Sequence, residues 1–191
     1  MRAFIFAAAL LTAGAASAEP VTYTLDPAHT QVAFSIDRFG FNRVLGRFET
    51  VTGELVLDEA NPANSSVRAT IQVASVDSGH DTRDEHLRAE RWLNAAAFPT
   101  MEFRSTAVRL TSERTAEVTG DLTLMGQTHP VTLNVTLNNI GPAPNNQRPT
   151  AGFSAIGSLN RSAFGSRGGA NVIGDSVSIQ IEALAQVAAT N

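Results

Sequence analysis

Alternation of apolar and polar side chains is the feature that most constrains how this chain can fold. In QVAFSIDR, Val32, Phe34 and Ile36 share one face while Ser35 lies on the other, as a half-buried strand requires. The alternation recurs at 67–73, 122–124, 131–137 and 177–181. Turn-forming pairs, among them Asn61-Pro62 and Gly168-Gly169, separate these segments. The pattern predicts an antiparallel sheet of about eight short strands, arranged as a sandwich or a closed barrel.

One segment follows the helical pattern instead. Thr82 is followed three residues later by Glu85, which resembles a capping box, and good helix formers continue to Leu93. We therefore expect one short helix at about 81–94, in which Arg83 and Asp84 form a structural ion pair that orients the helix on the sheet. A second segment, 39–45, is too short and mixed to distinguish a helical turn from an irregular one.

Composition excludes several classes of function. The chain has no Cys, and all 14 of its basic residues are Arg, so thiol catalysis, disulfides and Schiff-base lysines are excluded. Its net charge of -4 does not favour nucleic-acid binding. His80 and His86 are six residues apart, which places them on different sides of a helix and does not favour a zinc site. We expect no catalytic residue, no metal and no cofactor other than a bound lipid.

The N-terminal segment has the pattern of a secretory signal. In MRAFIFAAALLTAGAASA an early arginine precedes a short apolar run, and small residues end the segment at Ala18. We interpret 1–18 as a cleavable signal and 19–191 as one domain of the periplasm. No later stretch approaches the roughly 20 apolar residues of a membrane-spanning helix.

Six motifs, in order along the chain, resemble the YceI-like family of exported polyisoprenoid-binding proteins. They are LDPAHTQVAFSI at 25–36, GRF at 46–48, RDEHL at 83–87, FPTMEF at 98–103, GDLTLMGQTHPVTL at 120–133 and GFSAIGSLNRSAFG at 152–165. The resemblance runs from about Tyr23 to the last predicted strand. One position departs from it, because Arg38 stands where the family commonly has histidine, and we carry no role over to Arg38.

The resemblance implies an all-β fold, a lipocalin-like antiparallel barrel whose helix at about 81–94 acts as a lid or plug. It also implies an apolar channel that holds a long-chain isoprenoid or a similar amphiphile. Ten Phe against one Trp and one Tyr agree with an apolar wall, although the same rings could fill a solid core. The expected channel lining is Phe34, Ile36, Phe39, Phe41, Phe48, Leu87, Trp92, Leu93, Phe98, Phe103, Leu124, Phe153 and Phe164.

The resemblance leaves three functions open. The first is a periplasmic carrier or reservoir for a lipid, with His29, Arg83, His86 and Arg161 as head-group contacts. The second is an enzyme acting on a polyprenyl lipid or quinone precursor, with His29, His86 and Asp84 meeting at the channel mouth as acid and base. The third is a stress-related scavenger of amphiphiles. The expected partner is a hydrophobic small molecule, and transient membrane contact and dimerisation stay open.

The signal sequence generates the first prediction. We expect the exported protein to begin at Glu19, because Ala16, Ser17 and Ala18 provide the small residues that precede a cleavage site. N-terminal sequencing and intact-mass measurement of the periplasmic fraction check this. Recovery of a chain that still begins at Met1, or of protein in the cytoplasm alone, would contradict the interpretation.

Overall fold

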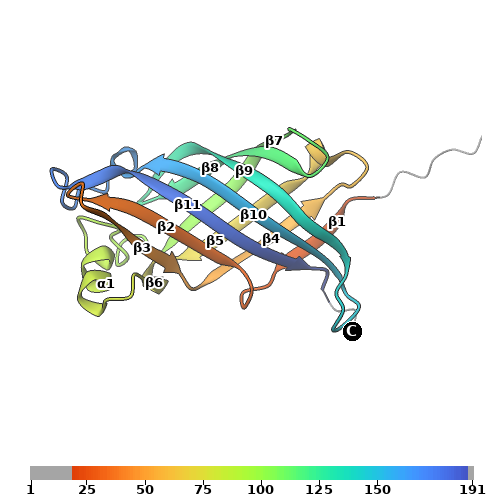
Figure 1. Ribbon diagram of the computed structural model, residues 1–191, viewed down its shortest axis with the longest axis horizontal. Coiled ribbons are helices and arrows are strands. Elements are labelled where there is room, and N and C mark those ends of the chain that lie inside the picture. Colours follow the sequence, from red (N-terminus) through yellow and green to blue (C-terminus); the bar gives the residue numbers. More distant parts are fainter. Residues whose placement is uncertain (1–18, 189–191) are drawn as a thin grey trace, which may run out of the picture.

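The computed structural model describes residues 19–188, and the predicted signal lies outside that range. Strands make up most of the described chain (Figure 1). The strands are β1 Val21–Leu25, β2 Gln31–Arg38, β3 Asn42–Phe48, β4 Val51–Leu57, β5 Ser66–Gln72, β6 Val76–Asp77, β7 Thr100–Leu110, β8 Thr115–Leu124, β9 Gln127–Pro142, β10 Pro149–Asn160 and β11 Ile173–Gln186. The helices are α1 Asp81–Arg88 and the 3-10 turns η1 Pro62–Asn64, η2 Val73–Ser75 and η3 Arg161–Phe164.

The strands form a closed antiparallel barrel of eight courses, as the sequence predicts. Three of the courses are broken into two strands each, β1 with β2, β3 with β4, and β5 with β6. The last strand shows this most directly, because β11 pairs with β2 between Val177 and Glu182 and with β1 at Ala185 and Gln186. Each course pairs with the next one along the chain, and β11 closes the ring.

The three broken courses bend at a common level. Backbone hydrogen bonds cross this bend, from Gln72 N to Thr50 O at 3.0 Å and from Glu49 N to Ser75 O at 3.1 Å. Beyond the bend, β6 pairs with β3, while Val73 N donates to Pro99 O at the start of the next course. Residues 78–99, which include α1, connect β6 to β7 at one end of the barrel (Figure 1).

Helix α1 is shorter than predicted and begins differently. It ends at Arg88, because Ala89 has extended backbone angles, and the chain turns back so that Leu93 N donates to Leu87 O at 3.0 Å. The capping box expected at Thr82 is absent, since His80 occupies the capping position without a side-chain hydrogen bond. Within residues 19–188 no helix is long and apolar enough to cross a bilayer.

Segment 39–45, which the sequence left undecided, forms a turn followed by the start of β3. Phe39 and Gly40 have φ of +58° and +70°, and Phe41 N donates to Arg38 O at 3.1 Å. Positive φ at both central residues is the pattern of a type I′ turn, and the register, with Arg38 opposite Asn42, leaves Phe39, Gly40 and Phe41 in the loop. The rest of the segment belongs to β3, which begins at Asn42.

Ser78 anchors the helix, and the ion pair expected between Arg83 and Asp84 is not formed. The buried carboxylate of Asp84 accepts from the backbone N–H and the hydroxyl of Ser78 at 2.8 and 2.5 Å. Arg83 donates to the hydroxyl and to the carbonyl of the same serine, both at 2.7 Å. Both charged side chains thus hold the segment that leads into the helix rather than each other.

The Ser78 anchor generates a stability prediction. Asp84→Ala leaves two half-buried donors of Ser78 without their acceptor, which costs about 1–3 kcal/mol of unfolding free energy. At roughly 2–4 °C per kcal/mol for a domain of this size, thermal unfolding should begin several degrees lower. Asp81→Ala removes an exposed carboxylate from the same helix and serves as the control. Equal melting temperatures of the two variants in circular dichroism would refute the anchoring role.

Candidate ligand-binding cavity

The inward faces of the strands enclose a cavity of about 480 Å³. The alternating residues of β2, β9 and β11 supply much of its lining, among them Val32, Leu133 and Ile181. Polar side chains gather toward the ends, with Arg161 and Ser166 near α1 and Glu113 and Arg114 at the β7–β8 turn. The cavity therefore has the apolar wall and few polar groups that are typical of small-molecule sites.

Two phenylalanine rings of the lining lie directly over glycines of neighbouring strands. A methyl group added at Gly46 would lie 2.4 Å from Cζ of Phe34, and one added at Gly120 would lie 2.4 Å from Cζ of Phe103. Both distances are far shorter than a carbon–carbon contact of about 3.5–4.0 Å. Because glycine has no side chain, each ring rests on the neighbouring backbone instead of projecting further inward. The cavity depends on these two pairs.

Trp92 and Arg161 close the end of the cavity beside α1. The indole packs on Gly168, where an added methyl group would come within 2.1 Å of it, and the Arg161 guanidinium lies 5.4 Å from the indole centroid. Leu87 and Leu93 complete this closure. The backbone N–H groups of Arg167 and Gly168 donate to Arg91 O at 2.9 and 2.7 Å, so the β10–β11 loop and the helical segment are joined.

Arg161 is a buried cation held by backbone carbonyls. Its side chain donates to Gly174 O at 2.9 Å, Ile173 O at 3.2 Å and Ser166 O at 3.3 Å. Burial lowers the pKa of the guanidinium, and the nearby carboxylate of Asp175 offsets part of this effect. Of the four head-group residues expected from the sequence, Arg161 is the one that lines the cavity.

The structure places nine of the thirteen predicted lining residues on the cavity wall. They are Phe34, Ile36, Phe48, Leu87, Trp92, Leu93, Phe103, Leu124 and Phe153. Whether each of them contacts a ligand stays a prediction.

The other four predicted lining residues lie elsewhere. Phe39 and Phe41 are exposed in the β2–β3 turn. The ring of Phe98 packs against Gly126 of the β8–β9 turn. Phe164 is buried edge-on to His129, with the ring centroids 5.0 Å apart. These four residues lie outside the lining of this cavity, contrary to the expectation.

The histidines expected at the channel mouth do not meet. His29 Nδ1 donates to the carboxylate of Asp26 at 2.7 Å in the β1–β2 loop, and this hydrogen bond lowers the pKa of the Asp26 carboxyl. That loop lies beside Leu184 near the end of β11, whereas Trp92 and the α1 segment lie beside the loop before β11 begins. His86 is exposed on α1, and Asp84 is engaged by Ser78.

Sequence reasoning missed much of the wall. It named no residue of β9 or β11, although Val131–Leu137 and Val177–Ile181 alternate clearly and their inner faces line the cavity. Alternation was the signal that could have found them, because every strand of a closed barrel contributes one face to the interior. It also missed Gly46 and Gly120, whose role depends on a neighbour in another strand. Among residues 19–188, no three His, Asp or Glu side chains are grouped to hold a metal ion.

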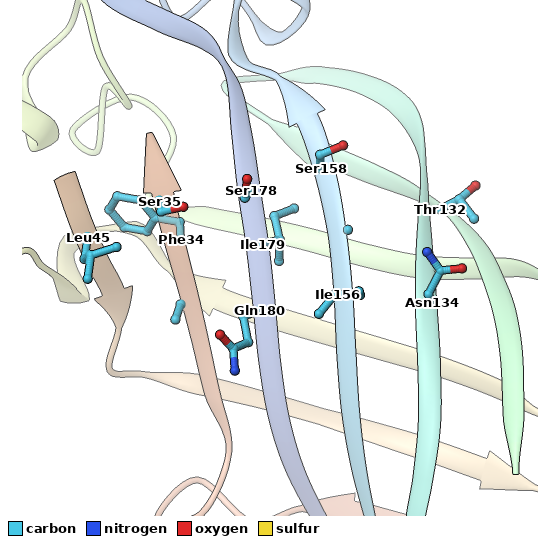
Figure 2. Close-up of a pocket in the computed structure, with 13 residues that line it drawn as sticks. Phe34, Ser35, Leu45, Thr132, Asn134, Ile156, Ser158, Ser178, Ile179 and Gln180 are labelled. Atoms are coloured by element: carbon cyan, nitrogen blue, oxygen red, sulfur yellow. The ribbon is translucent and has the colours of Figure 1, made fainter. Parts of the chain in front are cut away.

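A second depression lies on the outside of the barrel, across β2, β3, β9, β10 and β11 (Figure 2). Leu45 and Ile156 are exposed there among hydroxyl and amide side chains such as Ser178, Gln180 and Asn134. This depression is open to solvent, and polar groups make up a larger share of its lining than of the lining of the interior cavity. The enclosed interior cavity is therefore the better candidate for an apolar ligand.

The YceI-like domain model matches residues 23–185. A UPF0312 protein of Pseudomonas putida (strain W619) is 38% identical over 161 residues, which cover 84% of this chain and 83% of that protein.

Two solved structures share the fold. BcnA of Burkholderia cenocepacia superposes with a TM-score of 0.76 at 26% identity, covering 84% of this chain and 98% of that one. A polyisoprenoid binding domain from Saccharophagus degradans, implicated in plant cell wall breakdown, superposes with a TM-score of 0.64 at 16% identity, covering 87% and 98% of the two chains. At 16% identity the second likeness concerns the fold alone.

The pairing of Phe34 with Gly46 generates a prediction about the cavity. Gly46→Ala forces the Phe34 ring off the wall, and because the contacting atoms belong to that ring alone, the ring should swing inward. We expect weaker binding of an apolar fluorescent dye and a loss of about 1–3 kcal/mol of stability from overpacking. Gly152→Ala is the control, since its nearest neighbour would be Leu184 Cδ1 at 4.0 Å. Equal dye binding by both variants would contradict the role of Gly46.

Proposed function

Because the chain belongs to the YceI-like family and encloses an apolar cavity, we propose that it binds a long-chain isoprenoid or a similar amphiphilic lipid inside the barrel, as a carrier or reservoir. The observation that carries this proposal is the cavity itself. Its wall is apolar between polar ends, and glycines beneath Phe34 and Phe103 keep those rings on the wall. A barrel of eight strands has room for one slim ligand.

The energetics of binding favour a long tail. Each buried methylene contributes roughly 0.8 kcal/mol, whereas association costs an estimated 4–15 kcal/mol. A ligand with about ten methylenes would gain roughly 8 kcal/mol, which barely offsets that cost. A longer chain would bind well without strong polar contacts. The apolar wall, with Arg161 as a buried cation at one end, suits a long tail that carries a small polar head.

The Saccharophagus degradans domain suggests the ligand class by its name, while the likeness itself concerns the fold. That protein is called a polyisoprenoid binding domain and has the same fold. We extend this ligand class to the present chain because its own cavity has a matching apolar character. The signal-like segment 1–18 supports a periplasmic location, in which the protein would hold a lipid in water outside the inner membrane.

We propose binding rather than catalysis. The candidate acid and base residues His29 and His86 lie at different places on the barrel, and neither is among the residues that line the cavity. A reaction on the lipid would need a titratable group within hydrogen-bond reach of the reacting atom.

Organic extraction of the purified protein followed by mass spectrometry tests the proposal. One prenyl species at a stoichiometric amount supports a carrier or reservoir. A mixture of fatty compounds would favour a scavenger of amphiphiles instead. An empty protein that converts added prenyl lipid would favour an enzyme, and an empty protein that neither binds nor converts it would refute the proposal.

A charge placed in the cavity sharpens this test. Phe34→Arg should yield a folded protein that retains at least about tenfold less lipid. The reason is that placing a cation beside an apolar lipid tail in the cavity costs desolvation free energy. Asn134→Arg puts the same charge on the exposed outer face and is the control. Circular dichroism establishes folding and extraction measures the lipid. A folded Phe34→Arg protein with a normal lipid content would show that the tail lies elsewhere.

A further inference from the structure

Three large apolar side chains are exposed together at one end of the barrel. Phe41 is 90% exposed, and Phe39 and Val172 are each 45% exposed. Phe39 N donates to Val172 O at 2.9 Å, which joins the β2–β3 turn to the β10–β11 loop. We call Phe39, Phe41 and Val172 the apolar tip. The turn and the loop protrude at the same end of the molecule as α1 (Figure 1).

The turn that carries the tip is strained. Phe39 has φ of +58° at the first central position of the type I′ turn, where Asn or Asp is preferred. A bulky residue with positive φ is uncommon, and such strain is typically kept where it serves a function. Exposure adds to the cost, because Phe41 is almost fully exposed and Phe39 is about half exposed. Folding alone would therefore favour polar residues at both positions.

Arginines surround the tip although acids outnumber them in the chain, 18 against 14. The Arg38 guanidinium stacks over the Phe39 ring at 4.4 Å, and Arg43, Arg91 and Arg167 are exposed on the adjoining segments. The neighbouring acids are Asp37, Glu90 and Asp175. Two of these acids serve local structure, since Asp37 accepts from Gly40 N and Asp175 accepts from Ser162. The segments around the tip thus carry four arginines and three acids, and α1 at the same end adds two arginines and three acids, so this end is near neutral in an acidic protein.

We propose that the apolar tip docks on an anionic lipid bilayer. Phenylalanine side chains flanked by arginines match the boundary between acyl chains and phosphate head groups, where rings bury apolar surface and guanidinium groups meet phosphate. Anionic lipid also complements the local arginines and not the acidic remainder of the surface. Docking adds to lipid binding in the cavity and does not depend on it, because the tip lies outside the cavity lining.

The docked end would be the end that Trp92 closes. The loop that bears Val172 also bears Gly168, on which Trp92 packs, and Gly169, which lies near the same indole. Docking would therefore bring the α1 end of the cavity, rather than the β7–β8 end, to the membrane surface.

Vesicle co-sedimentation tests the docking. Residues 19–191, which contain every strand of the barrel, are mixed with vesicles of phosphatidylethanolamine and phosphatidylglycerol at 3:1, and with vesicles of phosphatidylcholine alone. We expect binding to the anionic vesicles, weakened by 1 M salt because screening then acts within about 3 Å. The double variant Phe39→Asn, Phe41→Ser should bind at least about tenfold less, since it removes both rings.

The variant also separates docking from a loss of folding. Asn suits the turn position better than Phe, so the double variant should melt at the same temperature as the parent protein or higher. Ile156→Ser removes an exposed apolar side chain from the outer wall and should leave vesicle binding unchanged. Equal vesicle binding by the parent and the double variant would overturn the proposal. So would a concentration-dependent dimer that the double variant abolishes without any vesicle binding, which would assign the tip to a second copy of the chain.

These outcomes are independent of those for the proposed function. A parent protein that binds anionic vesicles but carries no extractable lipid would retain the docking and refute the carrier. A parent protein that carries lipid but does not sediment with vesicles would retain the carrier and refute the docking.

Discussion

Closure of the hydrogen-bond ladder between β11 and the first course is the constraint on which the rest of the structure depends. Because β11 pairs with β2 along most of its length and with β1 at its end, the eight courses close into a ring. The ladder is interrupted at the α1 end, where β6 pairs with β3 and residues 78–99 separate β6 from β7. Every course then has an inner and an outer face, and alternation in the sequence becomes a division between cavity and solvent. The bend shared by the three broken courses is compatible with this closure because its backbone groups still pair across the break, as Gln72 does with Thr50.

The interior of a closed barrel of this size can be filled by side chains or can hold a cavity. Which of the two occurs depends on pairs of residues in neighbouring strands, and the alternation within one strand does not reveal these pairs. Phe34 and Phe103 are large enough to fill the interior, but Gly46 and Gly120 let the rings rest on the wall. The same device closes one end, where Trp92 packs on Gly168. The rings of Phe34 and Phe103 therefore stay at the wall of the cavity, whereas the indole of Trp92 fills its end beside α1.

The sequence predicts the strands well because alternation is a local property that each strand carries in its own residues, whereas the choice of a barrel over a sandwich rests on the resemblance to the family. The sequence predicts the site less well wherever a contact joins distant segments. Phe39 and Phe41 follow β2 closely in the sequence, but a turn with positive φ directs them to solvent. The expected pair of Arg83 and Asp84 is replaced by two contacts to Ser78, because neighbouring side chains on a helix point apart and a preceding loop can reach both. Likewise, the helix ends at Arg88, and the chain then turns back so that Trp92 and Leu93 line the cavity. This early end reflects tertiary packing, which the local helix propensity does not contain.

Arg161 links the interior to the protruding end of the barrel. Its guanidinium lies under the indole of Trp92 and donates to carbonyls of Ser166, Ile173 and Gly174, at both ends of the loop that carries Val172. No acid lies within ion-pair distance of it among the described residues, so its charge is compensated mainly by carbonyl dipoles. A buried cation held by one loop is sensitive to the shape of that loop, since a lost carbonyl leaves a desolvated donor. A displacement of the loop from outside would therefore act first on the contacts of Arg161 and Trp92, which form the closed end of the cavity.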